Sequence, residues 1–156
     1  MTACGIDPGR EKFGLAFADA ATGDSLIFSA IVPAGEFDSV TECMVCGSFA
    51  PLERWMIEKN AARCDFAACR VFVGDGTGLI FFSRKLDEKN IIYNIIDERH
   101  TTLEARKLYW RVNPPRGLWR LLPLSLRVPP RPVDDLAAWA ILKRGLCDEG
   151  AVKVSG

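Results

Sequence analysis

The chain of 156 residues lacks the features that would place it in a membrane or outside the cell. Its first residues contain no basic stretch followed by a long apolar run, as a secretion signal would. No window approaches the roughly 18 consecutive apolar residues of a membrane-spanning helix. We therefore expect a soluble, cytoplasmic protein with no membrane partner.

Disulfides are not expected either, because a chain without a secretion signal is predicted to remain in a reducing compartment. The six cysteines are then free thiols. Cys43 and Cys46 have a spacing suited to a structural zinc, whereas Cys64 and Cys69 do not, so free thiols are favoured over zinc. The single histidine, His100, excludes a conventional catalytic triad, although it could contact a phosphate or help a proton transfer.

Net charge is also absent, since twenty basic residues balance twenty acidic ones. A neutral chain argues against an electrostatically driven nucleic-acid binder. The charges are unevenly distributed, however: from Arg99 to Pro132 there are eight Arg or Lys residues and one acid, Glu104. Such a segment predicts a basic face beside an acidic remainder, which suits phosphate binding, although a solvated basic loop would look the same.

The hydrophobic pattern predicts one mixed α/β domain over residues 1–156. Short apolar runs separated by turn residues predict strands at 2–7, 13–19 and 26–32. Capping-box spacing of Ser39 and Glu42, and Pro51 as a helix start, predict one or two helices between 39 and about 63. Strands at 71–73 and 91–96 with a helix between them indicate a parallel crossover. Further helices are expected from Thr101 and from Val133, separated by a proline- and arginine-rich excursion at about 111–132.

Three acids lie where predicted elements begin or end: Asp7 and Glu98 at strand ends, and Asp134 at a helix start. Such positions cluster at one edge of an α/β sheet. Carboxylates brought together repel one another unless a cation neutralises them, which predicts Mg²⁺ or Mn²⁺. Two such ions could cleave a phosphodiester bond. Taken singly, each acid could equally serve a turn or a helix cap.

The motifs around these acids occur in the order of a known family. They are Gly5-Ile6-Asp7-Pro8-Gly9 with Gly14-Leu15-Ala16, Asp97-Glu98-Arg99-His100-Thr101-Thr102 with Glu104-Ala105-Arg106, and Val133-Asp134-Asp135-Leu136-Ala137-Ala138. Together they resemble the YqgF/RuvX family, over nearly the whole chain. The second motif is the most specific, since the first also occurs in actin-like ATPases.

The resemblance implies an RNase H-like fold, in which three antiparallel N-terminal strands precede parallel strands and helices cover both faces of the sheet. It implies that Asp7, Glu98 and Asp134 are catalytic metal ligands, with Asp97 and Asp135 as adjacent acids able to replace them. The implied activity is that of a Holliday junction resolvase or of a nuclease that matures ribosomal RNA precursors. Symmetric cutting of a junction would require a homodimer.

Structured RNA or branched DNA is therefore the expected partner. The residues predicted to contact it are Arg99, Thr101, Arg106, Lys107, Arg111, Arg116 and Arg120. Tyr109, Trp110 and Trp119 could stack on bases. Alternatively, Trp110, Trp119 and the leucines from 118 to 126 bury against the core, and burial is favoured for the tryptophans. Gly74, Gly76 and Thr77 form either a phosphate-binding loop or a plain flexible turn.

Two other functions are compatible with the sequence. The first is a nuclease-fold protein that has lost catalysis and binds nucleic acid through its basic excursion. The second is an actin-like nucleotide hydrolase, suggested by the Asp7-Pro8-Gly9 turn and the loop from Gly74 to Gly78. A chain of 156 residues is short for that two-domain architecture.

Overall fold

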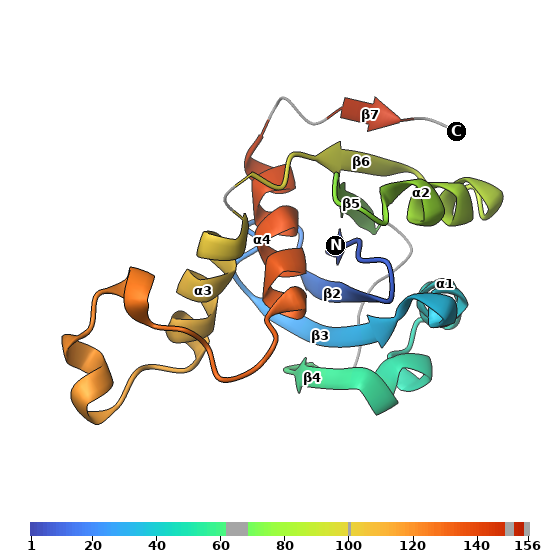
Figure 1. Cartoon of the computed structure of the whole chain (residues 1–156). Helices are drawn as coiled ribbons and strands as arrows, with labels where there is room; N and C mark the ends of the chain where they lie inside the picture. Colours follow the sequence, from blue (N-terminus) through green and yellow to red (C-terminus); the bar gives the residue numbers. More distant parts are fainter. Residues whose placement is uncertain (62–68, 100, 149–151, 155–156) are drawn as a thin grey trace.

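The computed structural model describes residues 1–61, 69–99, 101–148 and 152–154 (Figure 1). The strands are β1 (Thr2–Asp7), β2 (Lys12–Asp19), β3 (Leu26–Pro33), β4 (Met56–Lys59), β5 (Arg70–Gly74), β6 (Tyr93–Ile96) and β7 (Val152–Val154). The α-helices are α1 (Asp38–Cys46), α2 (Leu79–Glu88), α3 (Thr101–Val112) and α4 (Asp134–Cys147). Within these described ranges, no helix is long and apolar enough to cross a membrane.

All seven strands belong to one sheet in the order β4-β3-β2-β1-β5-β6-β7. The first four strands pair antiparallel in chain order along one half of the sheet. β5 pairs parallel to β1, and β6 pairs parallel to β5 after the α2 crossover. The predicted arrangement of three antiparallel N-terminal strands followed by parallel strands is therefore confirmed.

The prediction of an α-helix from Pro51 to about Arg63 is wrong in its described part. A 3-10 helix spans Ala50–Trp55, and β4 follows it directly and pairs with β3 at the sheet edge. Pro51 does lie in the first turn of a helical segment, as expected. Pairing with a strand about thirty positions earlier provides backbone hydrogen bonds that no local helical spacing reveals. The end of the predicted helix, including Arg63, lies outside the described residues.

Aromatic side chains fill the sheet face that α1 and α2 cover (Figure 1). The Phe13 ring packs edge-on against Phe37 and Phe82, with centroids 5.5 and 4.9 Å apart. Phe28 stacks on Phe49 at 4.3 Å. These rings bury large apolar areas and fix the helices on this face.

Small side chains line the opposite face, which α4 covers, and α3 packs against α4 (Figure 1). Ala16 and Ala18 of β2 are completely buried there against α4. Gly14 permits the closest approach, because a Cβ atom at this position would lie 1.8 Å from the carbonyl oxygen of Asp134. Any side chain larger than hydrogen would push the helix away. Gly14 therefore holds the N-terminus of α4 directly against β2.

The excursion between α3 and α4 extends away from the sheet (Figure 1, orange). It contains two 3-10 helices, η3 (Gly117–Leu121) and η4 (Leu124–Leu126). Trp110 is partly buried, and its Nε1 donates to the carbonyl oxygen of Arg127 at 3.2 Å. The expected burial of Trp119 is wrong: this ring stacks on Trp110 but remains 49% exposed. Several neighbouring apolar side chains are also exposed, namely Leu118, Leu121, Leu122, Leu126 and Val128.

Candidate active site

Asp7, Glu98 and Asp134 come from three elements that meet at one edge of the sheet. Asp7 is the last residue of β1 and pairs in register with Gly14 of β2. Asp134 is the first residue of α4, and its backbone packs on that same glycine. Glu98 follows β6, whose neighbour β5 pairs with β1. The close packing of α4 thus brings the helix-start acid to the end of the first strand.

Glu98 lies over the end of β5, where glycines leave room for its side chain. A Cβ atom at Gly74 would be 1.9 Å from Glu98 Oε1, and one at Gly76 would be 2.8 Å from Oε2. The backbone N–H of Glu98 donates to Asp75 Oδ1 at 2.9 Å. The glycines of the predicted phosphate loop therefore make space for a carboxylate. Asp75, which the sequence did not single out, helps to fix that carboxylate's backbone.

The electrostatics of this cluster favour protonation of two carboxyl groups. Burial, and then the negative charge of Asp134, raise the pKa of Asp7 to about 6, although a hydrogen bond with Glu98 and the charge of Lys12 oppose the rise. Burial and then the charges of Asp7 and Asp75 raise the pKa of Glu98 to about 7. Two carboxyl groups this close cannot both ionise cheaply. The cluster therefore holds more negative charge than Lys12 compensates.

The donors present fit a hard divalent cation. All are carboxylate oxygens, which are the ligands that Mg²⁺ and Mn²⁺ prefer. Glu98 Oε1 is buried and has no hydrogen-bond partner, so one oxygen remains available for a ligand. The arrangement is not a completed metal centre, since within the described ranges no three acidic, histidine or cysteine side chains form a group able to hold an ion. Instead, Lys12 Nζ lies 2.9 Å from Asp134 Oδ2.

The neighbouring acid Asp97 has a different set of contacts. Its carboxylate accepts hydrogen bonds from the backbone N–H and from Nε of Arg99, at 2.8 and 2.6 Å. These bonds lower the pKa of Asp97, so it remains an ordinary ionised surface acid. The structure does not bring it into the cluster with Asp7.

Asp135, the other alternative, is completely buried. Ser29 Oγ donates to its Oδ2 at 2.9 Å, and Arg131 donates to both carboxylate oxygens at 2.8 and 3.3 Å. A buried charge requires such partners. Because both oxygens are already engaged, Asp135 anchors α4 and the end of the excursion, and Asp134 is the acid that faces the cluster.

Two of the predicted nucleic-acid contacts lie next to Glu98. Thr101 is buried, and its Oγ1 donates to the carbonyl oxygen of Glu98 at 2.8 Å. It therefore positions the backbone of Glu98 and does not present its side chain to solvent. Arg99 is paired with Asp97, but its side chain is 84% exposed. His100 lies outside the described residues.

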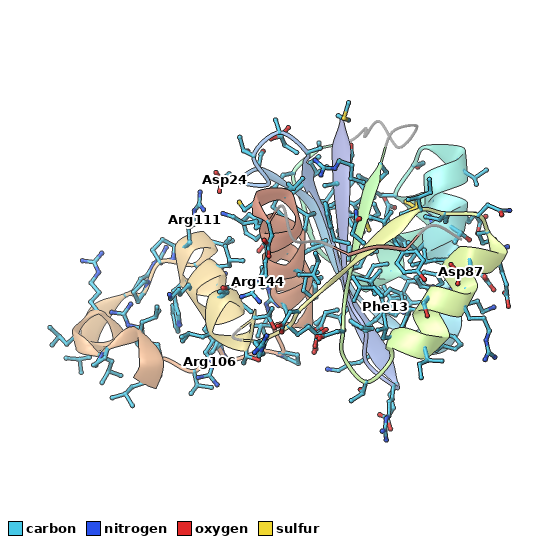
Figure 2. All side chains as sticks on the ribbon, turned by 90° about the horizontal axis from the view of Figure 1, so that it is seen from above. Phe13, Asp24, Asp87, Arg106, Arg111 and Arg144 are labelled. Atoms are coloured by element: carbon cyan, nitrogen blue, oxygen red, sulfur yellow. The ribbon has the colours of Figure 1, made fainter. Side chains whose placement is uncertain are left out.

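The remaining predicted contacts line α3 and the excursion. The exposed ones are Lys107, Arg111, Arg116 and Arg120, whereas Arg106 is half-buried. Arg111 pairs with Asp24 at 3.3 Å, and both lie close together in Figure 2. Arg120 donates from Nε to the carbonyl oxygen of Pro115. This surface therefore extends from α3, the helix that follows Glu98 in the chain, to the excursion.

Arg144 of α4 is a positioning residue that the sequence did not indicate. Its guanidinium donates to the carbonyl oxygens of Asp97 and Arg99 at 2.6 and 2.7 Å, and to Glu104 Oε1 at 2.7 Å. Figure 2 shows it on the α4 ribbon, next to α3. The helix that begins with Asp134 thus also holds the loop that carries Glu98. An arginine ten residues into a helix gives no local signal of this role.

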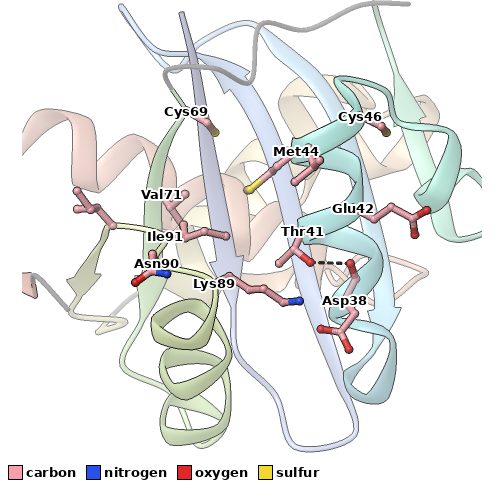
Figure 3. Close-up of a pocket in the computed structure, with 12 residues that line it drawn as sticks. Asp38, Thr41, Glu42, Met44, Cys46, Cys69, Val71, Lys89, Asn90 and Ile91 are labelled. Atoms are coloured by element: carbon pink, nitrogen blue, oxygen red, sulfur yellow. Dashed lines mark hydrogen bonds between the residues drawn. The ribbon is translucent and has the colours of Figure 1, made fainter.

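A groove among the described residues is lined by none of these acids. It has a volume of about 750 Å³ and lies between α1, the start of β5 and the connection from α2 to β6 (Figure 3). Cys46 and Cys69 line opposite sides of it. Neither they nor Cys43 form a metal-binding group with other described residues, and Cys64 lies outside the described residues. The zinc alternative therefore gains no support.

The strand order and the helices on both faces define an RNase H-like α/β fold. Two solved structures of RuvC from Thermus thermophilus share this fold. The one in complex with a Holliday junction substrate is 18% identical, with a TM-score of 0.53, over 99% of this chain and 99% of that chain. The other is 16% identical, with a TM-score of 0.53, over 99% of this chain and 100% of that chain. Identity this low establishes a common fold alone.

Sequence comparison adds no family assignment. No protein-family model matches the chain, and no curated protein sequence matches it. The resemblance to the YqgF/RuvX family therefore stays a prediction. It rests on the three motifs described above.

Proposed function

We propose that this protein is a metal-dependent nuclease that cleaves phosphodiester bonds in branched or structured nucleic acid. The observation that carries the proposal is the convergence of Asp7, Glu98 and Asp134 at one edge of an RNase H-like sheet. Their contacts leave negative charge uncompensated and one buried oxygen without a partner. A site that only stabilised the fold would gain nothing from such an arrangement.

The three acids share one task in this mechanism. Asp7, Glu98 and Asp134 would hold Mg²⁺ or Mn²⁺, which when bound supplies Lewis acidity and an activated water for in-line displacement at phosphorus. Thr101 and Arg144 keep the loop that carries Glu98 in place. These contacts hold the backbone that carries the Glu98 carboxylate, and in-line chemistry requires ligands at fixed positions.

The substrate proposed first is branched DNA. The similar RuvC structure was determined with a Holliday junction substrate, which supports a junction as the first molecule to test. The basic, acid-free stretch from Ala105 to Val133 supports binding of a polyanion, because cations there neutralise phosphates. Precursor ribosomal RNA is the alternative substrate, supported by the motif resemblance alone.

A second candidate function is a nucleic-acid-binding protein without catalysis. The contact between Lys12 and Asp134 favours it, because the ammonium occupies an oxygen that a metal would need. The same basic surface would then bind nucleic acid without cleaving it. An actin-like hydrolase is less well supported, since Gly74 and Gly76 make room for Glu98.

A cleavage assay separates these functions. A four-way DNA junction, a linear duplex of the same sequence and precursor ribosomal RNA are each incubated with Mg²⁺, with Mn²⁺ or with EDTA. The nuclease proposal requires metal-dependent cutting that Asp134→Asn abolishes while binding persists. Asp87→Asn, at an exposed acid on α2 (Figure 2), is the matched control and should cut normally. Binding without cutting under every condition would establish the second candidate.

A further inference from the structure

Lys12 is the basic residue that contacts the acidic cluster. It begins β2, two residues before Gly14, and so lies on the face of the sheet that α4 covers. Its Nζ is 2.9 Å from Asp134 Oδ2, and its side chain is 50% exposed. Of the ion pairs among the described residues, this is the one that includes Asp7, Glu98 or Asp134.

A single ammonium compensates this cluster only partly. Lys12 is one positive charge against three acids, and it contacts Asp134, whose side chain is 33% exposed. Glu98 Oε1 remains buried without a partner. The cluster can therefore still attract a cation of higher charge while Lys12 is in place.

A divalent ion and the ammonium would compete for the same carboxylate. Both require Asp134 oxygens, and two cations placed there together would repel each other. The lysine side chain is flexible and half-exposed, so it can leave Asp134 without disturbing the core. A released ammonium would remain beside the site, within reach of a bound phosphate.

We propose that Lys12 is a displaceable cation of the active site. It holds Asp134 in the metal-free protein, yields this carboxylate to the divalent ion, and then pairs with a non-bridging phosphate oxygen of the substrate. Both parts of this inference, the competition with the metal and the contact with phosphate, rest on the proposed function. It assigns to Lys12 both a control of metal affinity and a contribution to the reaction.

Metal binding without nucleic acid tests the first part. Mn²⁺ is titrated calorimetrically into the full chain as the parent, Lys12→Met and Lys12→Gln proteins, with Lys89→Met as an exposed control on the opposite face. Both Lys12 variants should bind Mn²⁺ about 2- to 5-fold more tightly, which is the range expected for losing a half-exposed competing ion pair. The Lys89→Met protein should match the parent. Equal or weaker binding by both Lys12 variants would overturn the competition.

Cleavage at saturating Mn²⁺ tests the second part. The Lys12→Met protein should cut the junction about 10- to 100-fold more slowly than the parent, because a cation at the transferring phosphate is lost. An unchanged rate would overturn the contact with phosphate. If the parent itself bound no Mn²⁺, the proposed metal-dependent function would fail together with this inference. If the parent bound Mn²⁺ and the Lys12 variants behaved like it, the inference alone would fail.

Discussion

Replacing Asp7 by asparagine should stabilise the metal-free protein at neutral pH. Burial, followed by the charge of Asp134, raises the pKa of Asp7 from 3.8 to about 6, a rise of about two pH units. Each pH unit corresponds to about 1.4 kcal/mol of preference for the protonated form. The ionised carboxylate therefore destabilises the folded state by about 3 kcal/mol once the pH exceeds 6.

The pH dependence has a definite sign. A raised carboxyl pKa means that the folded chain binds this proton more tightly than the unfolded chain does. The destabilisation is absent below about pH 3.8, grows up to about pH 6 and is complete above it. The Asp7→Asn protein should equal the parent at about pH 4 and exceed it by about 3 kcal/mol at about pH 7.5. That difference corresponds to about 6–12 °C in Tm for a chain of this size.

Urea unfolding in EDTA, followed by tryptophan fluorescence at several pH values, measures this difference. Asp97→Asn is the matched control, because bonds from Arg99 lower the pKa of Asp97 and its removal should bring no gain. Adding Mn²⁺ at about pH 7.5 should stabilise the parent and leave Asp7→Asn unaffected. An Asp7→Asn protein that is less stable than the parent at pH 7.5, or a difference that does not vary with pH, would refute the reasoning.

Four substitutions test the site further. Gly74→Ala adds a Cβ atom that would lie 1.9 Å from Glu98 Oε1, so this carboxylate must move and cleavage should fall about 100-fold. Gly35→Ala is the control: its Cβ would have no atom within 4 Å, and the protein should cut normally. Arg144→Met removes two hydrogen bonds to the loop after β6 and one to Glu104 of α3, and the unfolding free energy measured in urea should fall by about 2 kcal/mol. Asp135→Asn breaks a buried ion pair and should lower the unfolding free energy by about 3–5 kcal/mol. Asp134→Asn breaks a partly exposed pair, so it should change the unfolding free energy by less than about 1 kcal/mol, yet it should abolish cleavage. The opposite order of stabilities would show that the two acids had been assigned the wrong way round.

The strands and helices that depend on local patterns were predictable from the sequence. Apolar runs bounded by turn residues located β1, β2 and β3, and two runs separated by a helical segment located β5 and β6. The short strand β4 was not predictable, because its exposed edge position leaves no alternation and its partner lies far away in the chain. Exposure of Trp119 was missed for a related reason: an apolar side chain indicates burial only where other elements are near enough to cover it.

The sequence by itself determined which acids were candidates, since Asp7, Glu98 and Asp134 each lie at the end or the start of an element. Only the tertiary structure decided between neighbours. Adjacent residues point in different directions, so one acid of each pair faces the cluster while Asp97 and Asp135 bind arginines. The tertiary structure also decided how the three acids meet, because the missing side chain of Gly14 matters only where the start of α4 packs against it. Contacts between distant segments of the chain set these positions, and no local pattern encodes them.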